Sequence, residues 1–163
     1  MAELTLLSTG LLHSSCAVVE DGHDRGRIEP HAWPGRARVV VDHQPYDLRR
    51  DHLWRGPYRL RKGDAEVARA TGTLFKRHFH LSFETATGET TCELKGSRPL
   101  TEWTVEMGGA EVGAIRPLSG VRLRGRASLP DEFGPVGQLF CCALVVAMVG
   151  RRGLPTGVDG DHG

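Results

Sequence analysis

The chain has 163 residues, a quarter of them charged, and its 21 Lys and Arg residues exceed its 20 Asp and Glu residues by one. This near-neutral balance excludes a global field that would attract nucleic acid or an anionic membrane, so any such attraction has to be local. The length suits a single domain with one hydrophobic core that folds without disulfides or metals.

The N-terminal segment, Met1 to Leu12, contains an early acidic residue and only a short apolar run. It lacks the positively charged start of a secretory signal peptide, and this predicts a cytoplasmic protein. The cysteines show no C-x-x-C spacing, so they indicate neither a zinc site nor a disulfide framework. We expect them to be small, buried, apolar side chains; they are Cys16, Cys92, Cys141 and Cys142.

Glycine and proline divide the chain before residue 133 into short segments in which apolar and polar residues alternate. The clearest alternation lies in 36–42, 78–84 and 120–129, and it predicts half-buried β-strands. Turn signals at 62–64, 87–89 and 108–109 separate paired runs, as antiparallel hairpins require. A meander of hairpins is the expected result.

Two of these hairpins are copies of one pattern. The segments "YRLRKGDAEVARA" (58–70) and "WTVEMGGAEVGAI" (103–115) superpose without a gap, from an opening aromatic residue through a glycine turn to an identical Ala-Glu-Val. Alternation predicts that Val67 and Val112 face inward and that Glu66 and Glu111 face outward. A weaker copy is a candidate at 16–28.

The strands number about ten to twelve, more than a flat sheet usually carries, which predicts a closed antiparallel barrel.

The segment "QLFCCALVVAMVGRR" (138–152) is too short to span a membrane, and its flanking Pro135 and Gly150 suit a helix at about 135–149. A helix that is apolar all round has to be buried all round, so we place it inside the barrel. The single domain would then cover 1–152, followed by a disordered tail at 153–163 without a lipidation motif.

This pattern resembles the tubby C-terminal-like superfamily, in its LURP-one-related and phospholipid-scramblase-like branches. The resemblance rests on "GDAEVARA" and "GGAEVGAI", preceded by Tyr58 and Trp103, and on "DEFGPVGQLFCCALVVAMV" (131–149). It covers roughly residues 35–150 and implies a twelve-stranded barrel around one central helix. Some members bind phosphoinositides or act at membranes. The chain shows no phosphoinositide-binding motif, cysteine-rich palmitoylation tract or acidic calcium loop that would carry over.

A metal site is one candidate for chemistry. His78 and His80 alternate on one face of a strand, close enough to chelate a metal ion, with Glu84 farther along the same face as a third candidate ligand. Plain polar surface is the alternative. The Asp-His pairs at 42–43 and 51–52 have no accompanying nucleophile motif, and no nucleotide-binding glycine loop is present, so no cofactor is expected.

Alternating basic residues are the second candidate, because guanidinium groups bind phosphate bidentately. Arginines also alternate at 36–38, and the candidate lipid- or anion-binding residues are Arg122, Arg124, Arg126, Arg59, Arg61, Lys76 and Arg77. The alternative is a solvated exterior balanced by nearby glutamates. Proteins that bind single-stranded nucleic acid stack bases on aromatic side chains, and no aromatic residues alternate with these arginines. Nucleic acid is therefore a less favoured ligand than lipid.

The favoured function is a non-enzymatic binding or scaffolding barrel that recognises anionic phospholipid head groups, peripheral at a membrane surface and not transmembrane. The alternatives are a metal-dependent enzyme that uses His78 and His80, and a protein-protein interaction module with no role in lipid binding.

Overall fold

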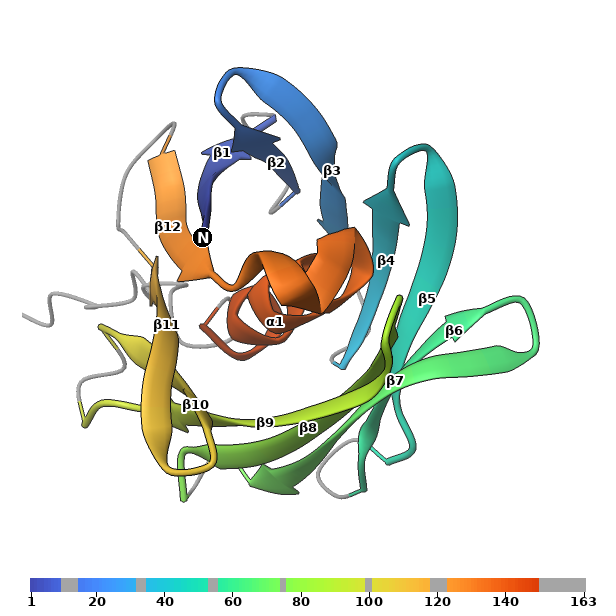
Figure 1. The fold of residues 1–163 in the computed structure, drawn as a ribbon. Helices are drawn as coiled ribbons and strands as arrows, with labels where there is room; N and C mark the ends of the chain where they lie inside the picture. The colour runs from blue at the N-terminus through green and yellow to red at the C-terminus, as the bar shows by residue number, and fades with distance from the viewer. Residues whose placement is uncertain are drawn as a thin grey trace, which may run out of the picture.

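In the computed structural model, the chain folds into a closed antiparallel barrel that is crossed by one helix (Figure 1). The structure describes residues 1–9, 15–31, 35–52, 56–73, 76–98, 101–117 and 123–149, and only the backbone of 123, 124 and 149. The strands are β1 (Ala2–Ser8), β2 (Cys16–Glu20), β3 (His23–Pro30), β4 (Arg36–Val41), β5 (Gln44–Arg50), β6 (Tyr58–Lys62), β7 (Ala65–Thr73), β8 (His78–Thr85), β9 (Gly88–Gly96), β10 (Trp103–Met107), β11 (Ala110–Pro117) and β12 (Leu123–Leu129).

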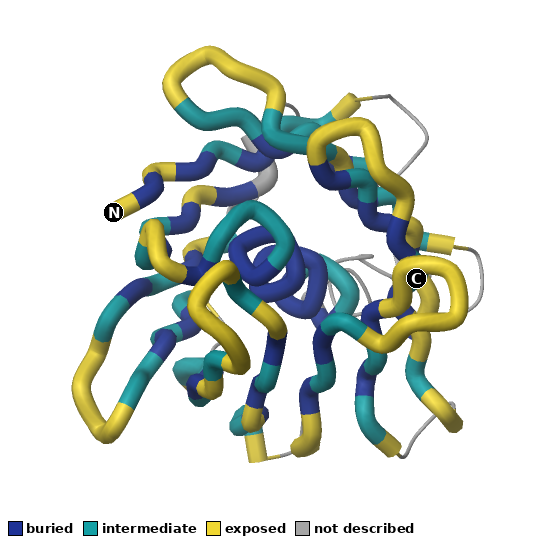
Figure 2. Tube along the Cα trace, turned by 45° about the vertical axis from the view of Figure 1, so that its right-hand side comes forward, coloured by how far each residue is buried: buried dark blue, intermediate teal, exposed yellow. Residues whose placement is uncertain are grey.

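The sheet is a meander in which each strand pairs with the next one along the chain, and β1 closes the barrel by pairing with both β2 and β12. Buried and exposed residues alternate along most strands (Figure 2), and the buried residues of the strands form one hydrophobic core with those of the helix. Closure removes exposed sheet edges, and the short glycine turns make a strand-to-strand meander feasible. The predicted fold class, a barrel of about twelve strands around a helix, is confirmed.

The repeated hairpins occupy equivalent structural units. In β6–β7 and in β10–β11 the register shifts after the third residue of the first strand, so Val67 and Val112 are the extra residues of two matching β-bulges. Both valines pack against the core, whereas Glu66 and Glu111 are exposed, as predicted. The weaker copy is also real, because β2–β3 has the same shift after its third residue. The copies begin at β2, β6 and β10, and therefore recur every fourth strand around the barrel.

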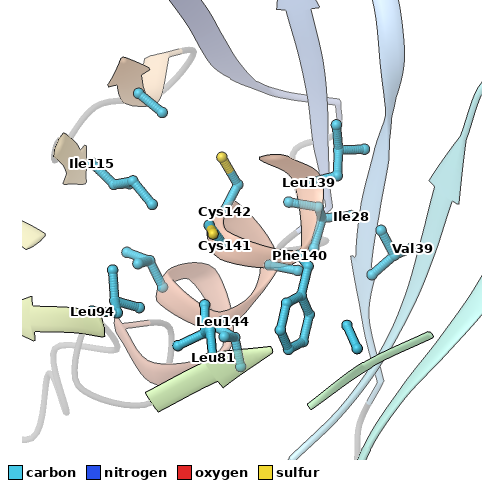
Figure 3. Close-up of a cluster of buried hydrophobic side chains, with 14 of the residues drawn as sticks. Ile28, Val39, Leu81, Leu94, Ile115, Leu139, Phe140, Cys141, Cys142 and Leu144 are labelled. Atoms are coloured by element: carbon cyan, nitrogen blue, oxygen red, sulfur yellow. The ribbon is translucent and has the colours of Figure 1, made fainter. Parts of the chain in front are cut away.

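The helix α1 (Gly134–Val149) follows a short 3-10 helix, η1 (Asp131–Phe133), and runs through the barrel. It contacts β3, β4, β8 and β11, which lie on different sides of it. Its side chains project in several directions into the core (Figure 3), and those from Leu139 to Val145 are all buried. The segment 131–148 is long and apolar enough to cross a membrane, but most of it is buried within the protein. A helix without a polar face is stable here because strands surround it.

All four cysteines are buried, as predicted, and none forms a disulfide. Burial raises the pKa of Cys142 from 9.0 to about 12, with a further contribution from Cys16. The pKa of Cys141 is also raised well above its usual value, first by a hydrogen bond with Cys92 and then by burial. Both helix thiols therefore stay protonated, and unreactive, at neutral pH.

This burial predicts a loss of stability in alkali. Above about pH 9 the unfolded thiols ionise and the native ones do not, so the unfolded state binds fewer protons and the free energy of unfolding falls. For each such thiol we expect the slope to approach about 1.4 kcal/mol per pH unit once the unfolded thiol is ionised, measured by urea unfolding between about pH 8 and 10. Iodoacetamide should label four cysteines in urea and none in the native protein; rapid native labelling would contradict the buried arrangement.

Candidate functional site

The basic residues singled out in the sequence do not form one patch. Arg59 and Arg61 lie on β6, whereas Arg126 lies on β12, six strands away and thus on the opposite side of the barrel. Lys76 and Arg77 occupy the turn between β7 and β8. Arg122 and the side chain of Arg124 are outside the described residues. Of the candidates whose side chains the structure describes, only the pair on β6 lies within a larger group of arginines.

That group lies on the outer face of β4 to β7. In register, Arg36 of β4 pairs with Arg49 of β5, Arg49 with Arg59 of β6, and Arg59 with Arg69 of β7, so four arginines form one row across four strands. The neighbouring row contains Arg38, Asp47 and Arg61, followed by Glu66. The four strands carry eight basic and two acidic residues in a chain of net charge +1, so basic charge is concentrated here.

We call the outward-facing residues of β4–β7 the arginine face. Carboxylates neutralise some of its arginines. Asp47 pairs with Arg49. Arg59 contacts Asp51 at 3.0 Å and Glu66 at 3.3 Å, and Arg69 contacts Glu66 at 3.0 Å. The hydrogen bond with Asp51, together with both carboxylate charges, raises the pKa of Arg59. Among the described residues no carboxylate forms an ion pair with the three remaining arginines of this face, which are Arg36, Arg38 and Arg61.

Two of these three arginines border one shallow pocket. The pocket has a volume of about 270 Å³, and its charged or titratable lining residues are His31, Arg38, Tyr46, Asp47 and Arg61. Arg38 and Arg61 lie on either side of Asp47 in the register of β4, β5 and β6, and both are exposed. The carboxylate of Asp47 already contacts Arg49. The guanidinium groups of Arg38 and Arg61 can therefore contact an anion in the pocket.

The predicted histidine pair also lies on the outer face, on β8. The ring centroids of His78 and His80 are 4.7 Å apart. Glu93 of β9 pairs with His80 in register, and its Oε1 atom lies 3.4 Å from His78 Nε2 and 3.3 Å from His80 Nδ1. The prediction of Glu84 as the third ligand is wrong. Glu84 lies opposite Glu89, toward the other end of β8, and Glu93 takes the third position.

The surroundings of Glu93 favour its ionised form. Burial raises the pKa of Glu93, but the charges of His78, Lys95 and His80 outweigh this effect and hold the pKa below its usual value. Lys95 lies 3.6 Å from Glu93 and only 2.8 Å from Glu106, so it is shared between two carboxylates. A groove of about 490 Å³ runs beside this group, and both His80 and Glu93 line it.

The Asp-His pairs form no catalytic arrangement among the described residues. Asp42 and His43 form the tight turn between β4 and β5, both with positive φ angles. Asp51 binds Arg59 and follows β5 together with His52. Both pairs are therefore explained by turn formation and ion pairing.

The sequence did not reveal Glu93, Arg49, Arg69 or His31 as members of these groups. Cross-strand register brings Glu93, Arg49 and Arg69 to their groups, and a single strand does not encode it. His31 follows β3 and is held beside β4 by the hydrogen bond from its backbone N–H to the carbonyl oxygen of Arg36. Compared with known protein families, curated proteins and solved structures, the chain matches none of them.

Proposed function

We propose that this protein is a non-enzymatic binding barrel that recognises phosphate-bearing head groups of anionic phospholipids through its arginine face. The pocket between Arg38 and Arg61 is the observation that carries this proposal, because neither of its two guanidinium groups forms an ion pair with a carboxylate of the described residues. Guanidinium groups bind phosphate oxygens through paired, charge-assisted hydrogen bonds. His31 at the same pocket adds a further nitrogen that can contact an oxyanion.

The shape of the site suits a head group at a surface. The pocket is shallow and the arginine face extends over four adjacent strands, so one phosphate can enter the pocket while Arg36 contacts neighbouring charges. Each arginine near an anionic membrane contributes about 1 kcal/mol, so three of them give a weak, salt-sensitive attraction. The membrane association proposed here is peripheral, with the protein in the cytoplasm.

The resemblance to the tubby C-terminal-like superfamily supports the same proposal, since some members of that superfamily bind phosphoinositides. The barrel around a central helix is the fold that this resemblance implies. Direct support for lipid binding comes only from the charges and the pocket, and these can be altered one by one.

Co-sedimentation with vesicles tests the proposal. The native protein should bind vesicles that contain polyphosphorylated phosphoinositide and should not bind vesicles of phosphatidylcholine alone, and added salt should weaken the binding. The double variant Arg38→Gln/Arg61→Gln should bind about 30-fold more weakly, because two contributions of about 1 kcal/mol are lost. Its thermal midpoint should stay nearly unchanged, since exposed charges contribute little to stability.

A matched control is the double variant Arg116→Gln/Arg126→Gln, which removes two exposed arginines that pair in register on β11 and β12. It should bind like the native protein. Loss of binding in this control alone would move the site to β12 and contradict the proposed pocket. A soluble inositol polyphosphate that binds at the pocket without any vesicle binding would identify a soluble ligand and refute the membrane role.

A further inference from the structure

A second site lies on β8 and β9, next to the β7 end of the arginine face, where Arg69 lines the same groove as His80 and Glu93. His78 and His80 project outward from β8, and Glu93 projects outward from β9 between their ring nitrogens. One donor atom from each of the three residues lies within 4.8 Å of the other two. We propose that His78, His80 and Glu93 bind a divalent transition-metal ion of the zinc class, with at least one coordination position left open to solvent.

The distances between the donor atoms suit such an ion. In a tetrahedral zinc site with bonds of about 2.0–2.1 Å, neighbouring ligand atoms lie about 3.3–3.4 Å apart. The two nitrogen–oxygen distances here are 3.4 Å from His78 and 3.3 Å from His80, both measured to Glu93 Oε1. Binding therefore requires small side-chain rotations that bring the two rings closer together, and no movement of the strands.

The donor set selects the class of metal. Two imidazole nitrogens and one carboxylate favour zinc and its neighbours in the first transition series, whereas calcium and magnesium prefer sites made of oxygen ligands. Three protein ligands leave a fourth tetrahedral position for water or another small ligand. His80 and Glu93 line the groove of about 490 Å³, so this position is accessible to a ligand in the groove.

An unsatisfied polar atom points to the same site. Within the part of the chain that the structure describes, His78 Nε2 is buried and makes no well-formed hydrogen bond, since its contact with Glu93 Oε1 is 3.4 Å long. A buried nitrogen without a partner is unfavourable, and a bound metal ion would satisfy it. Lys95 is the one lysine or arginine that forms an ion pair with Glu93 among the described residues, and its closer contact with Glu106 leaves the Glu93 carboxylate available.

Metal titration of the purified full-length protein tests the proposal. After treatment with EDTA, the native protein should bind one equivalent of Zn²⁺ in isothermal titration calorimetry, and Zn²⁺ should raise its thermal midpoint. Co²⁺ should bind with the visible absorption of a site of low coordination number. The variants His80→Gln and Glu93→Gln should bind Zn²⁺ at least about tenfold more weakly.

Glu84→Gln is the matched control, because it makes the same change on the outer face of β8 without touching the cluster. It should bind Zn²⁺ like the native protein. The metal-free variants should unfold at the same temperature as the metal-free native protein, which separates loss of a ligand from loss of the fold. Absence of stoichiometric binding in the native protein, or native-like binding by Glu93→Gln, would overturn the proposal.

The proposed metal site and the proposed lipid-binding pocket can be tested independently. The double variant Arg38→Gln/Arg61→Gln should still bind Zn²⁺ with native affinity, because its residues lie on β4 and β6 and the metal ligands lie on β8 and β9. Zinc binding with no binding to anionic vesicles would leave this inference standing and refute the proposed lipid function.

Discussion

The variant Leu144→Asp is expected to accumulate in the insoluble fraction and to show no cooperative unfolding transition. Leu144 is completely buried in the central helix. A carboxylate at this position has no partner, and burial of an unpaired charge costs several kcal/mol, comparable to the whole stability of a domain. Ala86→Asp is the control, since it adds the same charge at an exposed turn and should leave folding intact.

Leu144→Ala gives a measurable version of the same test. Truncation of a buried leucine leaves a cavity, and the free energy of unfolding should fall by about 2–5 kcal/mol in urea titrations. A soluble Leu144→Asp protein with native thermal stability would show that the helix does not occupy the core of the barrel.

Gly26→Ala is expected to destabilise the protein by about 2–6 kcal/mol, from backbone strain and overpacking that each contribute about 1–3 kcal/mol. Gly26 has a φ angle of +155°, a backbone conformation that residues other than glycine rarely adopt. An added Cβ would lie 2.1 Å from the backbone oxygen of Val40 and 2.5 Å from Leu139 Cδ2. The backbone of β4 would have to move and the Leu139 side chain would have to shift, and thermal or urea unfolding measures the loss.

Gly22→Ala provides the matched control in the turn of the same hairpin. Gly22 also has a positive φ angle, +76°, but an added Cβ meets no atom within 4 Å. Its cost should therefore be limited to the left-handed conformation, about 1–2 kcal/mol. Equal losses in the two variants would show that close packing between β3, β4 and the helix does not determine the effect.

Much of the fold could be predicted from the sequence because its signals are local. Alternation over 36–42 and 78–84 indicated strands, and these residues form β4 and β8. The repeated Ala-Glu-Val indicated two equivalent hairpins, and the structure has them with matching bulges. A run of apolar residues between Pro135 and Gly150 indicated the buried helix. Side-chain period and turn chemistry act over a few residues, so they can be read along the chain.

The candidate sites depend on which residues meet across strands, and only the tertiary structure decides this. Alternation placed His78 and His80 on one face, but the pairing of β8 with β9 brought Glu93, and not Glu84, beside them. Likewise, Arg61 and Arg126 carry the same local signal, yet barrel closure places them on opposite sides. The sequence by itself determined which residues face outward. Strand register, set by turns and bulges and by packing around the helix, determined which of them are neighbours.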